Sequence, residues 1–198
     1  GEMLGDHGLF HKSCFYEPSA RVPLIVKPAR SVPLPLRPGS VCERPVMLAD
    51  LYPTFMEAAG CARTPADDAR DGESLIGAMQ ADESRLLFGH ILDQGAMYMA
   101  TNEQWKYVYF TWDGREQLFR LREDPQELRD LSGSPQESHQ RELAAFRQRL
   151  AVRFADHPIV EQGRLKLGEE VAEANLPEWE LRSHNRCAWR GPFRPGGG

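Results

Sequence analysis

Four short apolar and aromatic runs, close together in the chain, limit most strongly what this sequence can fold into. The runs cover residues 86–92, 97–100, 105–111 and 117–121. Each has the length of an ordinary strand, and Asp113-Gly114 between the last two is a hairpin turn signal. Successive strands joined by short turns pair antiparallel. The sequence therefore predicts a four-stranded antiparallel sheet.

One amphipathic helix is predicted to follow this sheet, over residues 135–155. Ser134 is suited to cap the helix, Pro135 fits the first helical position, and Glu137 completes a capping box. The buried face is marked by apolar residues at helical spacing, which are Leu143, Phe146, Leu150 and Phe154. We expect residues 85–157 to form a small α+β subdomain in which this helix packs on the sheet.

The residues before the sheet show a different pattern. Residues 22–26 form an apolar run that predicts a short buried strand, and the proline-rich residues 28–45 predict an extended connection. Residues 48–59 have helical spacing, with Pro53 expected to kink the helix or begin its second part and Gly60 expected to follow its end. A polar loop over 62–73 and one helical turn over 74–79 complete the segment.

Composition excludes several classes of protein. The chain has 198 residues and a formal net charge of -5, which argues against a general nucleic-acid binder. No run of 18 or more apolar residues occurs, so no membrane partner is expected. The cysteines form no CxxC pair, so zinc-ligand spacing is absent, and we expect idle or buried thiols at Cys14, Cys42, Cys61 and Cys187.

The first candidate for chemistry is the glycine-flanked loop over residues 5–12. It holds two histidines, an acid and a lysine. The ammonium group of Lys12 is a compact charge that suits a tetrahedral oxyanion such as sulfate or phosphate, and a histidine can donate to the same anion or move a proton. A plain polar loop is the alternative. Because glycines disfavour a helix here, a metal site from His7 and His11 is not expected.

Two further groups of charged residues stand out. Glu17 and Arg21 are spaced to form an ion pair that would pin the loop to the core, with Arg21 entering the predicted strand. The C-terminal residues are rich in arginine and tryptophan and either line an anion pocket or form a solvated end. The tail residues in question are His184, Arg186, Trp189, Arg190 and Arg194.

Three stretches in this order resemble the sulfatase family of the alkaline-phosphatase superfamily, including its arylsulfatase and choline-sulfatase members. Residues 1–26 resemble the family segment that carries a lysine and a tyrosine-glutamate pair. Residues 47–61 and the following Asp71-Gly72-Glu73-Ser74-Leu75 resemble the pattern DL-PT-LL-AG … DG-SL. Residues 105–133 resemble the strand pair and DP-E signature of the small C-terminal subdomain. The resemblance covers about residues 1–155.

This resemblance implies an α/β fold. Residues 1–84 would be the C-terminal edge of an alkaline-phosphatase-like α/β core, residues 85–157 the small subdomain, and residues 158–198 an irregular tail. Lys12 corresponds to the family lysine that contacts the substrate sulfate, where it would stabilise charge developing on the ester. His7 lies where related enzymes carry a histidine near the site, and it would support Lys12 rather than react.

The resemblance also implies cofactors that these residues do not supply. The family binds calcium, a hard cation that prefers oxygen ligands, through an Asp-His pair expected immediately before Gly1. Its nucleophile is formylglycine, made from the Cys or Ser of a C/S-x-P-x-R motif, and no cysteine here is in that context. The chain is therefore either a fragment of a longer protein or a degenerate copy, and we expect a fragment that is inactive alone.

The full-length parent would hydrolyse small-molecule sulfate esters. One alternative is a phosphonate monoester or phosphodiester hydrolase of the same superfamily, since Lys12 would serve phosphate equally well. A second alternative is a non-catalytic module that binds a sulfated or phosphorylated ligand through Lys12 and the arginine-rich tail.

Overall fold

The computed structural model describes residues 1–27, 39–78, 84–91 and 97–167. They divide into two compact units. We call Gly1–Val22 with the residues from Phe88 onward the sheet unit, and Pro23–Leu87 the helical unit. The boundaries predicted at 84/85 and 157/158 concern the full-length protein and stay a prediction.

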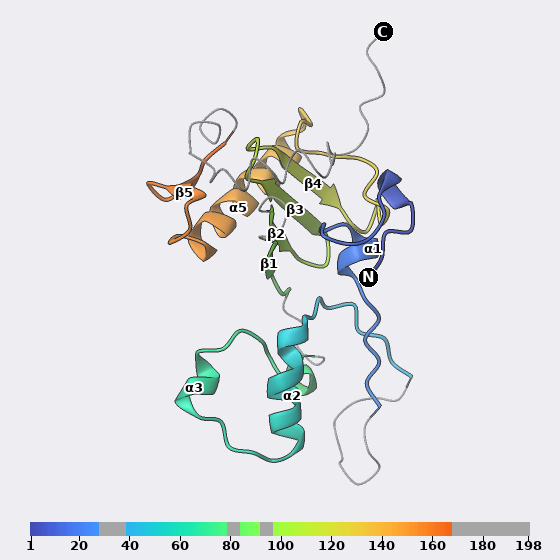
Figure 1. The fold of residues 1–198 in the computed structure, drawn as a ribbon, viewed down its shortest axis with the longest axis vertical. Helices are drawn as coiled ribbons and strands as arrows, with labels where there is room; N and C mark the ends of the chain where they lie inside the picture. The colour runs from blue at the N-terminus through green and yellow to red at the C-terminus, as the bar shows by residue number, and fades with distance from the viewer. Residues whose placement is uncertain (28–38, 79–83, 92–96, 168–198) are drawn as a thin grey trace. The chain divides into compact units, whose positions relative to one another are not determined.

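The sheet unit is built on the four strands that the sequence predicts. They are β1 (Leu87–Ile91), β2 (Met97–Thr101), β3 (Trp105–Phe110) and β4 (Glu116–Arg120). Their spatial order is β1-β2-β3-β4, and β2/β3 and β3/β4 pair antiparallel (Figure 1). Every residue of β2 and β3 is buried, so both faces of the sheet are covered.

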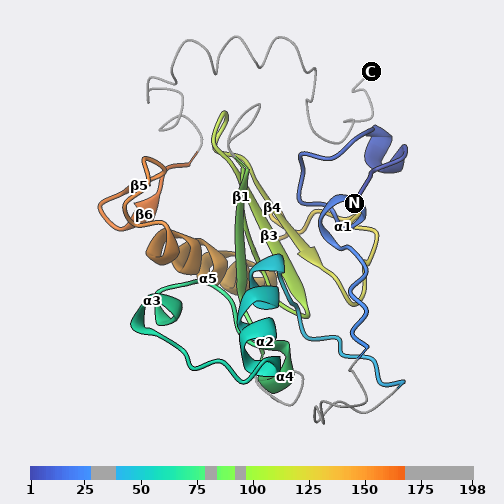
Figure 2. The ribbon, with the colours of Figure 1, turned by 60° about the horizontal axis from the view of Figure 1, so that its bottom comes forward.

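One face of the sheet is covered by helix α5 (Glu137–Arg153) (Figure 2). Phe146 stacks on Tyr107 of β3 with ring centroids 6.3 Å apart, and Phe154 meets Tyr98 of β2 edge-on at 4.9 Å. The predicted apolar face of this helix is confirmed, because Leu143, Phe146, Leu150 and Phe154 are all buried. A short hairpin of β5 (Val160–Glu161) and β6 (Arg164–Leu165) follows.

The predicted capping box of this helix is wrong. The helix begins at Glu137, and its N-cap, Gln136, makes no side-chain capping bond. The Ser134 hydroxyl instead accepts the backbone N–H of Gln136 at 3.3 Å and lies 2.8 Å from Nδ1 of His139. A serine side chain that bonds the backbone two residues ahead stabilises a turn in place of a helical start, so the helix begins after it.

The helical unit contains η2 (Leu48–Asp50), α2 (Leu51–Ala58), α3 (Pro65–Asp68) and α4 (Leu75–Ala78). The change predicted at Pro53 lies two residues earlier: the 3₁₀ turn gives way to the α-helix at Leu51, and Pro53 lies in the first turn of α2. Gly60 follows the helix with φ +66°, the left-handed conformation that glycine adopts at helix ends. The predicted helical turn over 74–79 is present as α4, whereas the predicted loop over 62–73 contains α3.

A buried ion pair holds the helical unit together. Arg85 donates to both carboxylate oxygens of Asp50, at 2.6 and 2.8 Å. Asp50 is fully buried and also accepts the backbone N–H groups of Met47 and Glu73. Burial alone would raise the pKa of Asp50, but the bonds from Arg85 and from these two amides lower it below 3.8.

The predicted buried strand over residues 22–26 is wrong for this chain. These residues are irregular, and Ile25 is 89% exposed. A strand needs a neighbour to pair its backbone N–H and C=O groups, and no strand among the described residues pairs with this segment. Within the same ranges, no helix has the length and hydropathy needed to cross a membrane.

Candidate active-site loop

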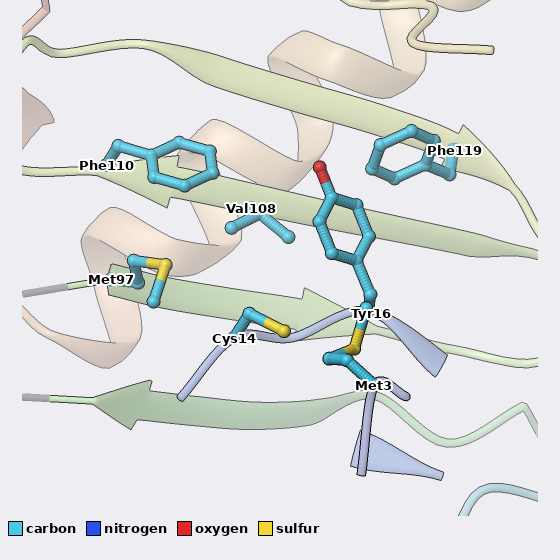
Figure 3. Close-up of a cluster of buried hydrophobic side chains, with 7 residues drawn as sticks. All are labelled: Met3, Cys14, Tyr16, Met97, Val108, Phe110 and Phe119. Carbon is cyan, nitrogen blue, oxygen red and sulfur yellow. The ribbon is translucent and has the colours of Figure 1, made fainter. Parts of the chain in front are cut away.

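The N-terminal segment covers the second face of the sheet. It is mostly irregular and contains η1 (Asp6–Gly8) and the single turn α1 (Glu17–Ala20). Figure 3 shows its buried side chains in front of the strands, with helix α5 behind them. The cluster joins Met3, Cys14 and Tyr16 of the loop to Met97, Val108, Phe110 and Phe119 of the sheet.

Lys12 lies at an exposed position of this loop. Its neighbours His11 and Ser13 both have left-handed backbone conformations, with φ of +68° and +94°. Such conformations are uncommon outside glycine and persist where surrounding contacts impose them. One such contact is the bond from the Met3 N–H to the His11 carbonyl, 2.8 Å long. The backbone on both sides of Lys12 therefore has a defined, uncommon conformation.

His7 is fixed at the other side of the loop. Its ring stacks on Tyr16 with centroids 4.0 Å apart and planes within 6°. Its Nε2 lies 2.9 Å from the carbonyl oxygen of Gln126, and because a carbonyl only accepts, Nε2 carries the proton. Both the stack and the bond hold the loop in place. Neither brings His7 to Lys12, so the structure gives His7 an anchoring contact.

A buried charged group holds the end of the loop. Lys106 of β3 is 1% exposed. Its Nζ donates to the carbonyl of Phe15 at 2.7 Å and to Oε1 of Glu17 at 2.6 Å, and it lies 2.8 Å from Oε1 of Glu127. The ammonium group thus makes two hydrogen bonds, to Phe15 and Glu17, and an ion pair with Glu127.

Glu127 completes this group from the turn after β4. Its Oε2 accepts the backbone N–H of Glu17 at 2.6 Å. It is 2% exposed and has φ +56°, and Asp124 stabilises the turn by accepting the N–H groups of Leu128 and Arg129. Burial raises the pKa of Glu127 above 4.5, against the opposing effect of Lys106.

The predicted ion pair between Glu17 and Arg21 is present, with Nη1 and Oε2 3.6 Å apart. Its predicted role is only half right, however. The Arg21 side chain is 75% exposed and enters no strand, so the bond that ties Glu17 to the core comes from Lys106. Sequence reasoning missed Lys106 and Glu127. The only sequence signal for them is that both are charged residues within 105–133, a segment that predicts strands and a turn.

Tyr16 contributes a buried hydroxyl to the same face. Its oxygen lies 3.3 Å from Oε1 and 3.1 Å from Nε2 of Gln117 on β4. Burial raises its pKa to about 12. Tyr16 is therefore neutral at physiological pH and serves to seat the loop rather than to exchange protons.

The described residues do not by themselves make a metal site. No group of three or more His, Cys, Asp or Glu side chains among them converges to hold a metal ion. A small hollow beside Tyr52 and Met56 in the helical unit has room for about one water molecule. The arginine-rich tail, including Arg186 and Arg190, and Cys187 lie outside the described residues.

The thiols in the described ranges do not form disulfides. Cys14 is buried, whereas Cys42 and Cys61 are exposed, and all three are free. Burial raises the pKa of the Cys14 thiol, which opposes formation of the nucleophilic thiolate. Cys14 therefore acts as a core residue.

Comparison with known proteins gives consistent matches. The family model for "N-sulphoglucosamine sulphohydrolase, C-terminal" matches residues 5–153. The chain is 34% identical over 153 residues to the choline-sulfatase of Rhizobium meliloti, covering 74% of this chain and 28% of that protein. It is 32% identical over 157 residues to arylsulfatase K of Xenopus laevis, covering 71% of this chain and 28% of that protein.

A solved structure matches as well. It is a protein in complex with its substrate D-glucosamine-2-N,6-O-disulfate, with a TM-score of 0.64 at 23% identity, covering 80% of this chain and 33% of that one. At this identity the likeness shows the fold, and it confirms the α/β class predicted from the sequence. The chain spans 28% of the length of the two curated relatives.

Proposed function

Because the chain belongs to the sulfatase family, we propose that the full-length protein hydrolyses small-molecule sulfate esters and that this chain is its C-terminal part. The observation that carries the proposal is the family match over residues 5–153, which spans both the Lys12 loop and the sheet that supports it. The match favours neither a phosphonate or phosphodiester hydrolase nor a non-catalytic anion-binding module.

Lys12 is the residue of this chain that we assign to the reaction. Its side chain is exposed on a loop whose two flanks are anchored to the sheet unit. An ammonium group held in such a place can contact a sulfate oxygen and stabilise the charge that develops as the ester bond breaks. His7 would act indirectly, by holding the loop through Tyr16 and Gln126.

Calcium and formylglycine belong to the proposal at the level of the full-length protein. The described residues do not fit a calcium site, because no three potential ligands converge among them, and the described cysteines are a core thiol and two in other sequence contexts. We propose that both groups are supplied by parts of the full-length protein that this chain does not include.

The proposed substrate class is a small organic sulfate ester. One relative is named for choline sulfate hydrolysis, and one structural neighbour holds a sulfated glucosamine. Both are small sulfated molecules, and they differ in the group that carries the sulfate. We therefore propose that the sulfate group of the substrate lies near Lys12. Other parts of the full-length protein would bind the group that carries the sulfate.

The test is a paired assay of the full-length protein with 4-nitrophenyl sulfate and 4-nitrophenyl phenylphosphonate. We expect the sulfate ester to be hydrolysed faster, and Lys12→Ala to lower kcat by about 10²- to 10³-fold, the usual effect of removing one group that stabilises transition-state charge. Lys27→Ala, which removes an exposed lysine, is the matched control and should change little. A faster reaction with the phosphonate, or unchanged kcat in Lys12→Ala, would reject the assignment.

A further inference from the structure

We propose that Lys106 and Glu127 are positioning residues for Lys12, so that the small sheet of this chain takes part in catalysis by fixing the Lys12 loop. The proposal rests on the function proposed above. Neither residue reaches the reaction itself, since Lys106 is 1% and Glu127 2% exposed. They act on the backbone that carries Lys12.

The turn at residues 126–127 holds the loop on both sides of Lys12. On one side, the Gln126 carbonyl accepts from His7, five residues before Lys12. On the other side, the Glu127 carboxylate accepts the N–H of Glu17, five residues after Lys12. One short turn therefore closes the loop, and any shift of that turn would move both flanks of Lys12 together.

Lys106 adds a contact closer to Lys12. Its Nζ donates to the Phe15 carbonyl, three residues from Lys12, at 2.7 Å. The same ammonium group contacts Glu17 and Glu127, which joins the loop to the closing turn. Without it, two carboxylates would face each other at the loop's end, and like charges at short range repel. The ammonium group thus adds an attraction between the loop and the turn to the bonds that His7 and the Glu17 N–H make with the turn.

The position of Lys106 makes it a rigid anchor. It lies within β3 and pairs in register with Phe119 of β4, between strands that are buried on both faces. A positioning contact is effective when its supporting residues are fixed by packing. Displacement of a reacting group by about 1 Å can lower a rate about 10²-fold. Loss of the Lys106 anchor is therefore expected to lower the rate by displacing Lys12.

The opposite face of the same strand offers a matched control. Tyr107 is fully buried on the helix side, and its hydroxyl donates to Glu116 at 2.6 Å. Tyr107→Phe removes a buried hydrogen bond next to Lys106 in sequence without touching the loop. A loss that follows only from removing a polar contact of this strand should appear in Tyr107→Phe as well.

The first experiment is a double-mutant cycle in the full-length protein, with kcat measured on 4-nitrophenyl sulfate. We expect Lys106→Met to lower kcat on the order of tenfold or more when Lys12 is present. In the Lys12→Ala background the same change should cost less than about twofold, since the contact then has nothing to position. Equal losses in the two backgrounds would overturn the proposal, as would a loss of the same size in Tyr107→Phe.

A second variant covers the case in which Lys106→Met fails to fold. Lys106→Met combined with Glu127→Gln removes both charges and keeps an acceptor for the Glu17 N–H, while the contact to Phe15 stays broken. We expect this pair of changes to lower kcat about tenfold at unchanged circular dichroism. Full activity in this variant would show that the ammonium contact positions nothing.

A separate readout distinguishes this proposal from the proposed function. In the 198-residue chain, trypsin cleavage after Lys12 should become at least about fivefold faster in Lys106→Met with Glu127→Gln, because local opening controls cleavage of an ordered loop, and it should stay unchanged in Tyr107→Phe. Unchanged cleavage in the first variant would overturn the anchoring of the loop. Inactivity of the full-length wild-type protein on sulfate esters would instead reject the function and leave cleavage to decide the anchoring.

Discussion

The two faces of the four-stranded sheet are both buried, but they are covered in different ways. Helix α5 lies on one face, and the contacts there are mainly apolar and aromatic, as with Phe146 on Tyr107. The irregular N-terminal loop lies on the other, where the sheet contributes a buried ammonium group from Lys106. Alternate residues of a single strand, β3, thus meet two different environments.

The difference follows from how each cover satisfies its own backbone. A helix pairs its N–H and C=O groups internally, so its buried face can be apolar. A loop leaves backbone groups unpaired, and buried ones require partners. Here the Phe15 carbonyl and the Glu17 N–H receive them from Lys106 and Glu127. The loop face therefore contains buried charged residues because the segment that covers it is irregular and needs partners for its backbone groups.

The largest effect is expected on the helix face. Phe146→Ala should lower the free energy of unfolding of the sheet unit by about 3–5 kcal/mol, because it removes a fully buried ring and leaves a cavity. Urea unfolding followed by near-ultraviolet circular dichroism measures this change. Trypsin cleavage after Lys12 at low urea should remain slow. A loss below about 1 kcal/mol would mean that α5 does not pack as described.

A slightly smaller effect is expected on the loop face. Lys106→Met should cost about 3 kcal/mol, because it leaves buried Glu127 without its opposite charge. Adding Glu127→Gln should recover at least half of the loss in the same urea experiment. If the added change made the chain less stable still, the carboxylate would not be the source of the cost.

The two buried tyrosines give a matched comparison across the sheet. Tyr16→Phe should lower stability by about 1 kcal/mol, since it leaves Gln117 without the hydroxyl to which it is bonded. Tyr107→Phe should cost less, because Glu116 keeps its pair with Arg147. Urea midpoints of the two variants measure the difference. The reverse order would indicate that the helix face depends more on its polar contacts than the loop face does.

The smallest effect concerns pH. Burial raises the pKa of Glu127 above 4.5, so the folded state binds this proton more tightly than the unfolded state. The associated stability is fully present below about pH 4.5 and is lost as pH rises through the folded pKa. Glu127→Gln should remove this loss. The urea midpoint of Glu127→Gln minus that of wild type should therefore be larger at pH 7 than at pH 4.5. The same difference at both pH values would contradict the raised pKa of Glu127.

The strands and the long helix could be predicted from the sequence because their signals are local. Apolar runs, a hairpin turn before Arg115 and the spacing of Phe146 and Leu150 each need only neighbouring residues to be interpreted. The same local reasoning failed at Ser134, where a turn competed with a capping box, and at residues 22–26. An apolar run predicts a strand, but a strand forms only beside a partner that the run cannot specify.

For this protein, the amino-acid pattern was enough to define the sheet, its covering helix, the family and Lys12 as the residue to test. It could not indicate that Lys106 and Glu127, 91 and 112 residues after Phe15 in the chain, meet at one end of the Lys12 loop. A buried charge is tolerable only where the folded chain brings its partners to it. Those partners depend on long-range packing, so the anchor of the loop became visible only in the folded structure.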